Sequence, residues 1–138
     1  MFLLDTNVLF ELRRPDRANA GVVAWAAETD PADLFVSAIT LFEIEVGAAQ
    51  VARRDPAQGL LLRAWIDGHV MPTFKDRILP VDAAIAQRCA RLHVPDRQPQ
   101  NDSLIAATAL VHRLTLVTRN VRDFDPMRVA VLNPWRLD

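Results

Sequence analysis

Cysteine is nearly absent from this chain of 138 residues: Cys89 is the only one, which excludes an internal disulfide bond. The helical pattern around Cys89 favours a buried thiol over a nucleophile. Long apolar runs are also missing. None approaches the ~20 residues that cross a bilayer, and no basic segment leads into an apolar one at the start. We therefore expect a cytoplasmic protein that does not enter a membrane.

Lysine is scarce as well, since Lys75 is the only lysine among 16 basic residues, and the formal net charge is −1. This balance argues against a protein that wraps nucleic acid through its net field. Arginine suits bidentate phosphate contacts and favours a local basic rim, although Arg-rich codon usage would give the same count. No phosphate loop ending in Gly-Lys-Ser/Thr is present, and the histidines lack zinc-ligand spacing, which disfavours a nucleoside triphosphatase and a zinc site.

Short apolar runs alternate with helical periodicity, the pattern of a parallel α/β sheet within a single domain spanning residues 1–138. Strands are predicted at residues 2–4, 34–37, 78–81, 114–118 and 129–132. Helices are predicted at residues 7–13, 20–28, 40–53, 56–70, 82–92 and 101–113. The polar, proline-containing segment 93–100 is the predicted mobile loop, and it runs directly into the last of these helices.

Three scattered carboxylates stand where apolar elements would not normally place a charge. Asp5 ends the first apolar run, Glu43 lies in an apolar helical segment, and Asp102 opens the inward stripe of the last helix. Burying an unpaired carboxylate costs roughly several kcal/mol, so such groups pair, protonate or bind a cation. If the three converge, Mg²⁺ or Mn²⁺ would neutralise them most simply, and the chain would be a metal-dependent phosphodiester hydrolase.

Each carboxylate also has a purely structural interpretation. The first would cap the helix that follows it, and the third would favour the dipole of its own helix. Thr40 and Glu43 match a capping box, in which the glutamate reaches back to the cap residue. Gly47, on the same helix face, would instead leave space beside the Glu43 carboxylate. Glu45 is rotated by about 200° from Glu43 and is expected to be solvated.

A further polar cluster follows the fourth predicted strand and contains Thr118, Arg119, Asn120 and Asp123. Asn120 is nearer the strand end and Asp123 keeps a charge, so either is a candidate fourth catalytic residue, although both are also common turn residues. Arg119 is a candidate phosphate contact, although an exposed arginine in a turn is more often simply solvated.

The sequence around these acids resembles the PIN domain family, and more narrowly its VapC-type toxin ribonucleases of the FitB-like branch. Residues 3–8 (LLDTNV) are similar to the family's opening signature, Glu43-x-x-x-Gly47 to its second motif, Asp102-x-x-Ile105-Ala106-Ala107 to its third and Thr118-Arg119-Asn120 to its fourth. Order and spacing agree across nearly the whole chain, including the closing Asn133-Pro134-Trp135. Asn120 departs from the Asp that many members carry, which weakens the case for a second metal unless Asp123 substitutes.

The resemblance implies a three-layer α/β/α domain with a twisted, mainly parallel sheet of about five strands. It implies an endoribonuclease in which Asp5, Glu43 and Asp102 bind Mg²⁺, with Mn²⁺ as an alternative, and in which a metal-activated water hydrolyses RNA. Weaker candidates for contacts with the substrate are Thr6, Asn7, Thr118 and Arg119.

The resemblance also implies a partner, the small VapB-like antitoxin of a bacterial toxin–antitoxin pair. We expect this antitoxin to fold on binding, to cover the helices near Glu43 and Trp65, and to present a basic side chain to the acidic site. A homodimer is expected, and a heterotetramer or larger assembly with the antitoxin, which alone would contact operator DNA.

Other readings remain. A catalytically silent module with the same fold would act only through protein or nucleic-acid contacts, although intact acids at three motifs argue against it. A receiver domain or a dehalogenase-like phosphatase would also place an aspartate after the first strand. Both are disfavoured, because Asn7 breaks the Asp-x-Asp pattern and Lys75 is misplaced for a receiver.

Overall fold

The computed structural model describes residues 1–136 and contains a five-stranded, all-parallel sheet in the order β3-β2-β1-β4-β5. The strands are β1 (Phe2–Leu4), β2 (Leu34–Ser37), β3 (Ile78–Leu79), β4 (Thr115–Val117) and β5 (Val131–Leu132). Each forms within a predicted strand. The last three are shorter than predicted. Beside β4 and β5, the residues Leu114, Thr118 and Val129 are buried but lie outside the paired strands, whereas Pro80 and Val81 after β3 are exposed.

The helices are α1 (Thr6–Leu12), α2 (Ala20–Glu28), α3 (Ala38–Arg54), α4 (Pro56–Trp65), α5 (Met71–Thr73), α6 (Ala83–Leu92), α7 (Gln100–His112) and α8 (Val121–Phe124). The predicted helix at 56–70 is instead α4 followed by a π-helical turn at Ile66–Val70, and α5 and α8 were not predicted. A 3-10 turn at Pro134–Arg136 closes the described chain. Within residues 1–136, none of the helices is long and apolar enough to cross a membrane.

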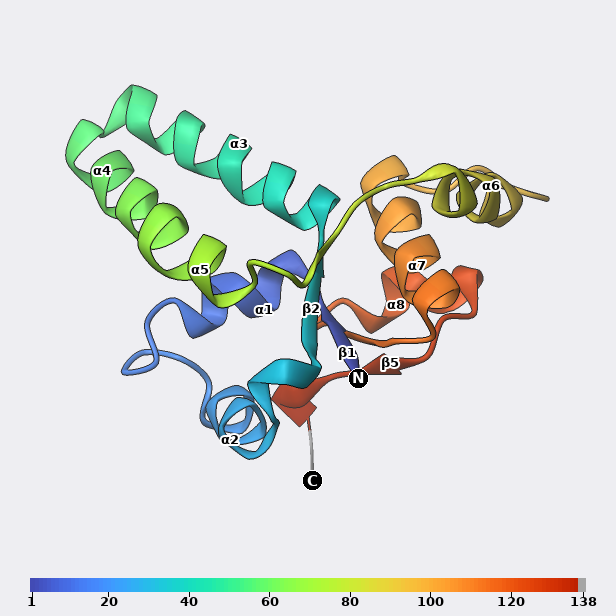
Figure 1. Ribbon diagram of the computed structural model, residues 1–138, viewed down its shortest axis with the longest axis horizontal. Helices are drawn as coiled ribbons and strands as arrows, with labels where there is room; N and C mark the ends of the chain where they lie inside the picture. Colours follow the sequence, from blue (N-terminus) through green and yellow to red (C-terminus); the bar gives the residue numbers. More distant parts are fainter. Residues whose placement is uncertain (137–138) are drawn as a thin grey trace.

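Alternate strand side chains enter two hydrophobic cores, one on each face of the sheet. Leu4 and Val117 belong to the core that also contains residues of α1, α2, α3 and α4. Leu3 and Leu116 belong to the second core, with residues of α7 and α8. Figure 1 shows these two groups of helices on opposite sides of the strands. The three-layer α/β/α architecture is confirmed, and burial on both faces explains why the strands read as continuous apolar runs.

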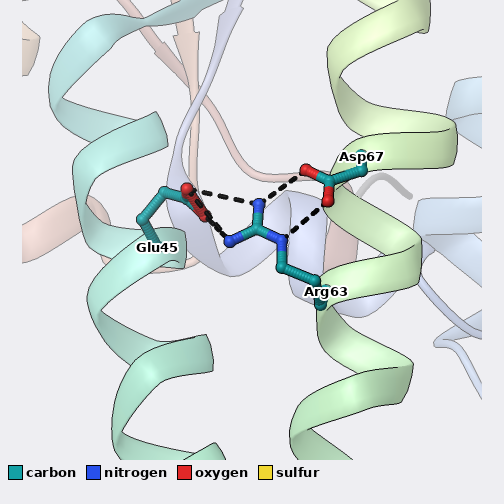
Figure 2. A network of polar contacts seen from close by, with 3 residues as sticks. All are labelled: Glu45, Arg63 and Asp67. Carbon is teal, nitrogen blue, oxygen red and sulfur yellow. Dashed lines mark hydrogen bonds and ion pairs between the residues drawn. The ribbon is translucent and has the colours of Figure 1, made fainter.

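Helices α3 and α4 lie side by side as a pair that reaches away from the sheet (Figure 1). Their close approach depends on Gly59, where an added Cβ would lie 2.5 Å from Ala52 Cα. Arg63 on α4 pairs with Asp67 and with Glu45 on α3, each at 2.7 Å (Figure 2). The expectation of a merely solvated Glu45 is therefore wrong, because the neighbouring helix brings a guanidinium to it.

The strand order places the topological switch point of the sheet between β1 and β4. The chain reaches β2 through α1 and α2 on one face of the sheet, and it reaches β4 through α6 and α7, of which α7 packs on the other face. Open parallel sheets bind ligands at such a switch point, outside the carboxyl ends of the strands. Asp5 directly follows β1 and Thr118 directly follows β4, so both stand at this point.

Candidate active site

Asp5 is the centre of the polar residues at the β1–β4 switch point, and only 5% of its surface is exposed. Its Oδ1 accepts a hydrogen bond from the Thr6 amide at 2.8 Å and so caps α1, as the structural interpretation expected. Its Oδ2 accepts from Thr118 Oγ1 at 2.8 Å and from Asn7 Nδ2 at 3.3 Å. Capping therefore accounts for one oxygen, and the other belongs to a network at the switch point.

Thr118 is fully buried and joins the two loops that leave β1 and β4. While its hydroxyl donates to Asp5, it accepts from Asn7 Nδ2 at 3.3 Å and from the Asn120 amide at 3.0 Å. Asn7 Oδ1 in turn accepts from the Arg119 amide at 3.3 Å. Asn7 and Thr118, predicted as weak substrate contacts, are thus engaged in positioning Asp5, and their contact with a substrate stays a prediction.

Glu43 reaches the same site from α3. Its Oε1 accepts from Thr6 Oγ1 at 2.6 Å, which brings it beside the residue that follows Asp5. The capping box predicted for Thr40 and Glu43 is wrong, because the cap of α3 is Ser37, whose Oγ accepts from a backbone amide two residues on. Thr40 lies inside the first turn and is fully buried, and among residues 1–136 its hydroxyl has no partner.

Gly47 was expected to leave space beside the Glu43 carboxylate, and the role of that space stays a prediction. A Cβ at this position would meet Phe10 Cζ at 3.7 Å, an ordinary contact. Phe10 lies against Trp65, with 5.5 Å between the ring centroids. The neighbour of Gly47 is therefore an aromatic pair that joins α1 and α4.

Asp102 stands in the first turn of α7 and is half-buried, with no hydrogen bond to its carboxylate from the described part of the chain. The pKa of Asp102 is raised from 3.8 to about 6, first by burial and then by the negative charges of Asp5, Asp123 and Glu43, in that order. The predicted inward stripe of this helix is confirmed by Ile105, Ala106 and Ala109, which are fully buried.

The pKa of Asp5 is raised as well, first by burial. The hydrogen bonds from Thr118 and the Thr6 amide act against burial and lower it, whereas the charges of Glu43 and Asp123 raise it. All four carboxylates therefore interact within one electrostatic field. Asp123 is part of this group despite its exposed position, while Asn120 adds only amide and backbone groups.

The donor chemistry of this cluster fits a divalent cation that prefers oxygen ligands. Carboxylates whose pKa values are raised first by burial and then by mutual repulsion are groups that a cation would neutralise. As the side chains stand, no three His, Cys, Asp or Glu residues between positions 1 and 136 are grouped closely enough to hold a metal. A cation would therefore have to draw the acids together on binding.

Sequence reasoning missed the network behind Asp102. His93 Nδ1 accepts from the Gln98 amide at 3.1 Å, so Nε2 carries the hydrogen and donates to Ser103 Oγ at 2.9 Å. Ser103 Oγ donates to the Gln100 carbonyl at 2.8 Å. This network fastens the 93–100 loop and the first turn of α7 to the end of α6. The only signal was a serine directly after the acid, an ordinary residue in a first turn.

Comparisons with known proteins agree with this geometry. Residues 2–129 match the family described as PIN domain. Toxin FitB of Neisseria gonorrhoeae is 36% identical over 140 residues, covering 98% of this chain and 99% of its own length. VapC ribonuclease Y4jK of Sinorhizobium fredii is 33% identical over 144 residues, covering 98% of both.

Solved structures share the fold. FitAcB from Neisseria gonorrhoeae superposes with a TM-score of 0.90 at 37% identity, covering 99% of this chain and 100% of the other. A chain of a toxin–antitoxin complex from Klebsiella pneumoniae gives 0.71 at 28% identity, with coverage of 99% and 100%. With the family match over most of the chain and these relatives over nearly all of it, the chain belongs to the PIN domain family.

Proposed function

We propose that this protein is an endoribonuclease that depends on Mg²⁺, or alternatively Mn²⁺, and acts as the toxin of a toxin–antitoxin pair. The observation that carries the proposal is the group of Asp5, Glu43, Asp102 and Asp123 at the β1–β4 switch point, where burial and mutual repulsion raise the pKa values of Asp5 and Asp102. The relatives named toxin and ribonuclease support it. A cytoplasmic location follows from the proposed substrate and stays a prediction.

Asp5, Glu43 and Asp102 would hold the cation, which when bound supplies charge stabilisation at the phosphate and acidifies a water. The chain itself orients these ligands: Thr118 and the Thr6 amide fix Asp5, and the Thr6 hydroxyl fixes Glu43. Asp123 adds negative charge at the exposed side of the site.

A water is the expected nucleophile. The two hydroxyls of the site belong to Thr6 and Thr118, and both donate their hydrogens to carboxylates. As a water oxygen bonds to phosphorus, the bond to the 3′ oxygen breaks and that oxygen takes a proton. The RNA 2′-hydroxyl is a bystander, so the products carry 5′-phosphate and 3′-hydroxyl ends. A main product with a 2′,3′-cyclic phosphate would contradict this route.

The direct test uses Asp5→Asn and Asp102→Asn, which remove ligand charge and nearly preserve shape. Purified, antitoxin-free variants should lose cleavage of end-labelled RNA in Mg²⁺ while melting as cooperatively as the wild type. Asp76→Asn, at an exposed position outside the cluster, is the matched control and should cleave normally. Cleavage by Asp5→Asn at the wild-type rate would refute the proposal. RNA binding without cleavage in Mg²⁺, Mn²⁺ or chelator would favour the catalytically silent module.

The proposed antitoxin has a suitable surface on the α3–α4 pair. A groove of about 560 Å³ between these helices is lined by small and apolar residues, among them Ala48, Ala52 and Leu60. Leu60 is 72% exposed and Phe42 56% exposed. An amphipathic helix of the antitoxin would cover such residues, and a basic side chain beside it would neutralise the acid cluster.

We further propose a homodimer that forms a heterotetramer or larger assembly with the antitoxin, operator DNA being contacted only through the antitoxin. The Klebsiella pneumoniae complex shows that a chain of this fold pairs with an antitoxin. Expression with and without the adjacent gene tests the assignment. Two results together would refute the toxin–antitoxin assignment: expression of the chain alone does not slow growth, and the product of the adjacent gene does not co-purify with it. The proposed nuclease activity would not be affected by these results.

A further inference from the structure

Beside the acid cluster lies a hollow of about 890 Å³ that the proposed chemistry does not use. The turn after β4, helix α8 and the 3-10 turn at Pro134–Arg136 surround it, and Asn120 and Asp123 belong to its lining. It therefore opens onto the candidate active site. We call it the arginine hollow, after Arg119, Arg122 and Arg136 in its wall.

The charge of the arginine hollow differs from that of the whole chain, whose net charge is only −1. Arg119, Arg122 and Arg136 are all exposed, and among residues 1–136 Asp123 is the one acid that lines the hollow with them. In the described part of the chain every ion pair involves Arg63, so none of the three arginines is neutralised by a carboxylate there. An anion with several charges spaced along it would complement this wall.

The hollow also contains a fixed aromatic surface. Trp135 is half-buried and packs at its inner side against the core that contains α1 and α2, so its ring has little freedom. Arg119 Cζ lies 5.5 Å from the Trp135 ring centroid, which places a planar guanidinium over the indole. Proteins that bind single-stranded nucleic acid stack unpaired bases on aromatic rings and on guanidinium planes of this kind.

Two hydrogen bonds connect this aromatic surface with the catalytic acids. The Arg119 amide donates to Asn7 Oδ1 at 3.3 Å, and Asn7 Nδ2 donates to Asp5 Oδ2 at 3.3 Å. The backbone of Arg119 is thus fixed relative to Asp5, which keeps its side chain on the same side of the site as Trp135. A nucleotide held in the arginine hollow would neighbour the phosphate placed at the acids.

We propose that the arginine hollow is a subsite for single-stranded RNA next to the scissile phosphate, an inference that rests on the proposed ribonuclease function. Arg122 and Arg136 contact backbone phosphates, and one nucleobase stacks on the pair formed by Trp135 and Arg119. The site takes single-stranded rather than duplex RNA, because base faces are accessible only when a strand is unpaired.

The first test measures binding of a short, unstructured, fluorescently labelled RNA in EDTA, where no cleavage occurs, as a function of KCl concentration. Each phosphate contact on a single strand contributes about 0.7 to the slope of log affinity against log salt. The double variant Arg122→Gln/Arg136→Gln should therefore flatten the slope by about 1.4. Arg53→Gln/Arg54→Gln removes the same charge from the last turn of α3, away from the hollow, and should leave the slope unchanged.

The second test concerns stacking. Trp135→Leu should weaken RNA binding on the order of ten-fold, whereas Trp135→Phe keeps a ring and should retain most of the affinity. In Mg²⁺ the arginine double variant should raise KM with kcat nearly unchanged. Trp135→Leu also removes packing against the core and could unfold the protein. In that case Trp135→Phe and the arginine double variant provide the test.

The outcomes separate the subsite from the proposed function. If the wild type cleaves RNA but the hollow variants match the Arg53/Arg54 control, the subsite is wrong and the ribonuclease stands. If no RNA is cleaved in Mg²⁺ or Mn²⁺, yet binding depends on the hollow as described, the ribonuclease is wrong and RNA binding stands. Equal affinity for duplex RNA would overturn the stacking. Loss of antitoxin co-purification with unchanged RNA affinity would overturn the subsite in favour of a protein interface.

Discussion

Thr118 donates its hydroxyl hydrogen to Asp5 across the ends of β4 and β1, with 2.8 Å between Thr118 Oγ1 and Asp5 Oδ2. The two residues are 113 positions apart in the chain, yet both are buried at the same edge of the sheet. This bond opposes the effect of burial on the pKa of Asp5, because it favours the charged carboxylate. It is one device by which the fold keeps a buried acid available as a ligand.

Thr118→Val should therefore raise the pKa of Asp5 beyond its already elevated value. The acid side of the pH–rate profile for RNA cleavage should move to higher pH. The free energy of unfolding near pH 7 should fall by about 1.5–3 kcal/mol, which is typical for a lost hydrogen bond to a charged group. Thr118→Ser keeps the hydroxyl and should restore the profile. A valine variant with the wild-type profile would show that the bond does not control Asp5.

The raised pKa of Asp102 predicts how metal-free stability depends on pH. Between 3.8 and about 6 the folded state binds more protons at Asp102 than the unfolded state does. The free energy of unfolding should therefore decrease as pH rises through that window. Asp102→Asn does not titrate and should show a flatter decrease, which thermal melting in EDTA at pH 4 to 7 would measure.

The same shift predicts a pH-dependent response to metal, because ligands must be deprotonated to bind a cation. Mg²⁺ should raise the melting temperature more at pH 7 than at pH 5, and cleavage should decline as pH falls through about 6. An equal increase of the melting temperature by Mg²⁺ at pH 5 and at pH 7 would mean that Asp102 is not part of the cation site.

Much of the fold could be predicted because its strands are buried on both faces and its main helices are long. The predicted helix at 20–28 matches α2, and the acids after β1 and in α7 lie where strand order and periodicity placed them. Helix α8 escaped prediction because four residues hold only one buried side chain, Phe124, and no periodicity. The π-helical turn at Ile66–Val70 escaped because its apolar pattern reads like ordinary helix.

The site was predicted as a set of acids but not as a network. Nothing in the sequence distinguishes Ser37 from Thr40 as the cap of α3, since both are good capping residues near the same helix start. The partner of Glu43 is Thr6, which is 37 residues away, so only the packing of α3 against α1 reveals it. Hydrogen-bond partners of this kind depend on tertiary contacts, so they cannot be predicted from the local sequence.

Gly59 offers a stability prediction with an internal control. Gly59→Ala would place a Cβ 2.5 Å from Ala52 Cα, so α3 and α4 would have to separate. We expect a loss of about 1–3 kcal/mol, the usual range for overpacking. Gly68→Ala, at a position where no atom of residues 1–136 lies within 4 Å of the added Cβ, should be neutral or stabilising by up to ~1 kcal/mol. Chemical denaturation of both variants decides the matter, and equal stabilities would show that the helices do not pack this closely.

The hydrogen bond from Thr6 to Glu43 predicts that a residue outside the ligand set governs cation affinity. Thr6→Val removes the donor at 2.6 Å from Glu43 Oε1 and frees that carboxylate. Loss of such an orienting partner typically weakens metal binding by about 10–100-fold, which calorimetric titration with Mn²⁺ would measure without RNA. Thr6→Ser should restore affinity.

A double-mutant cycle shows whether Thr6 acts through Glu43. If it does, Thr6→Val combined with Glu43→Gln should bind Mn²⁺ no more weakly than Glu43→Gln alone, because the orienting bond has no charged ligand left to hold. Additive losses would mean that the Thr6 side chain acts on the site by another route than its hydrogen bond to Glu43. The cycle thus isolates the hydroxyl contact with Glu43, because Thr6→Val keeps the backbone amide that donates to Asp5.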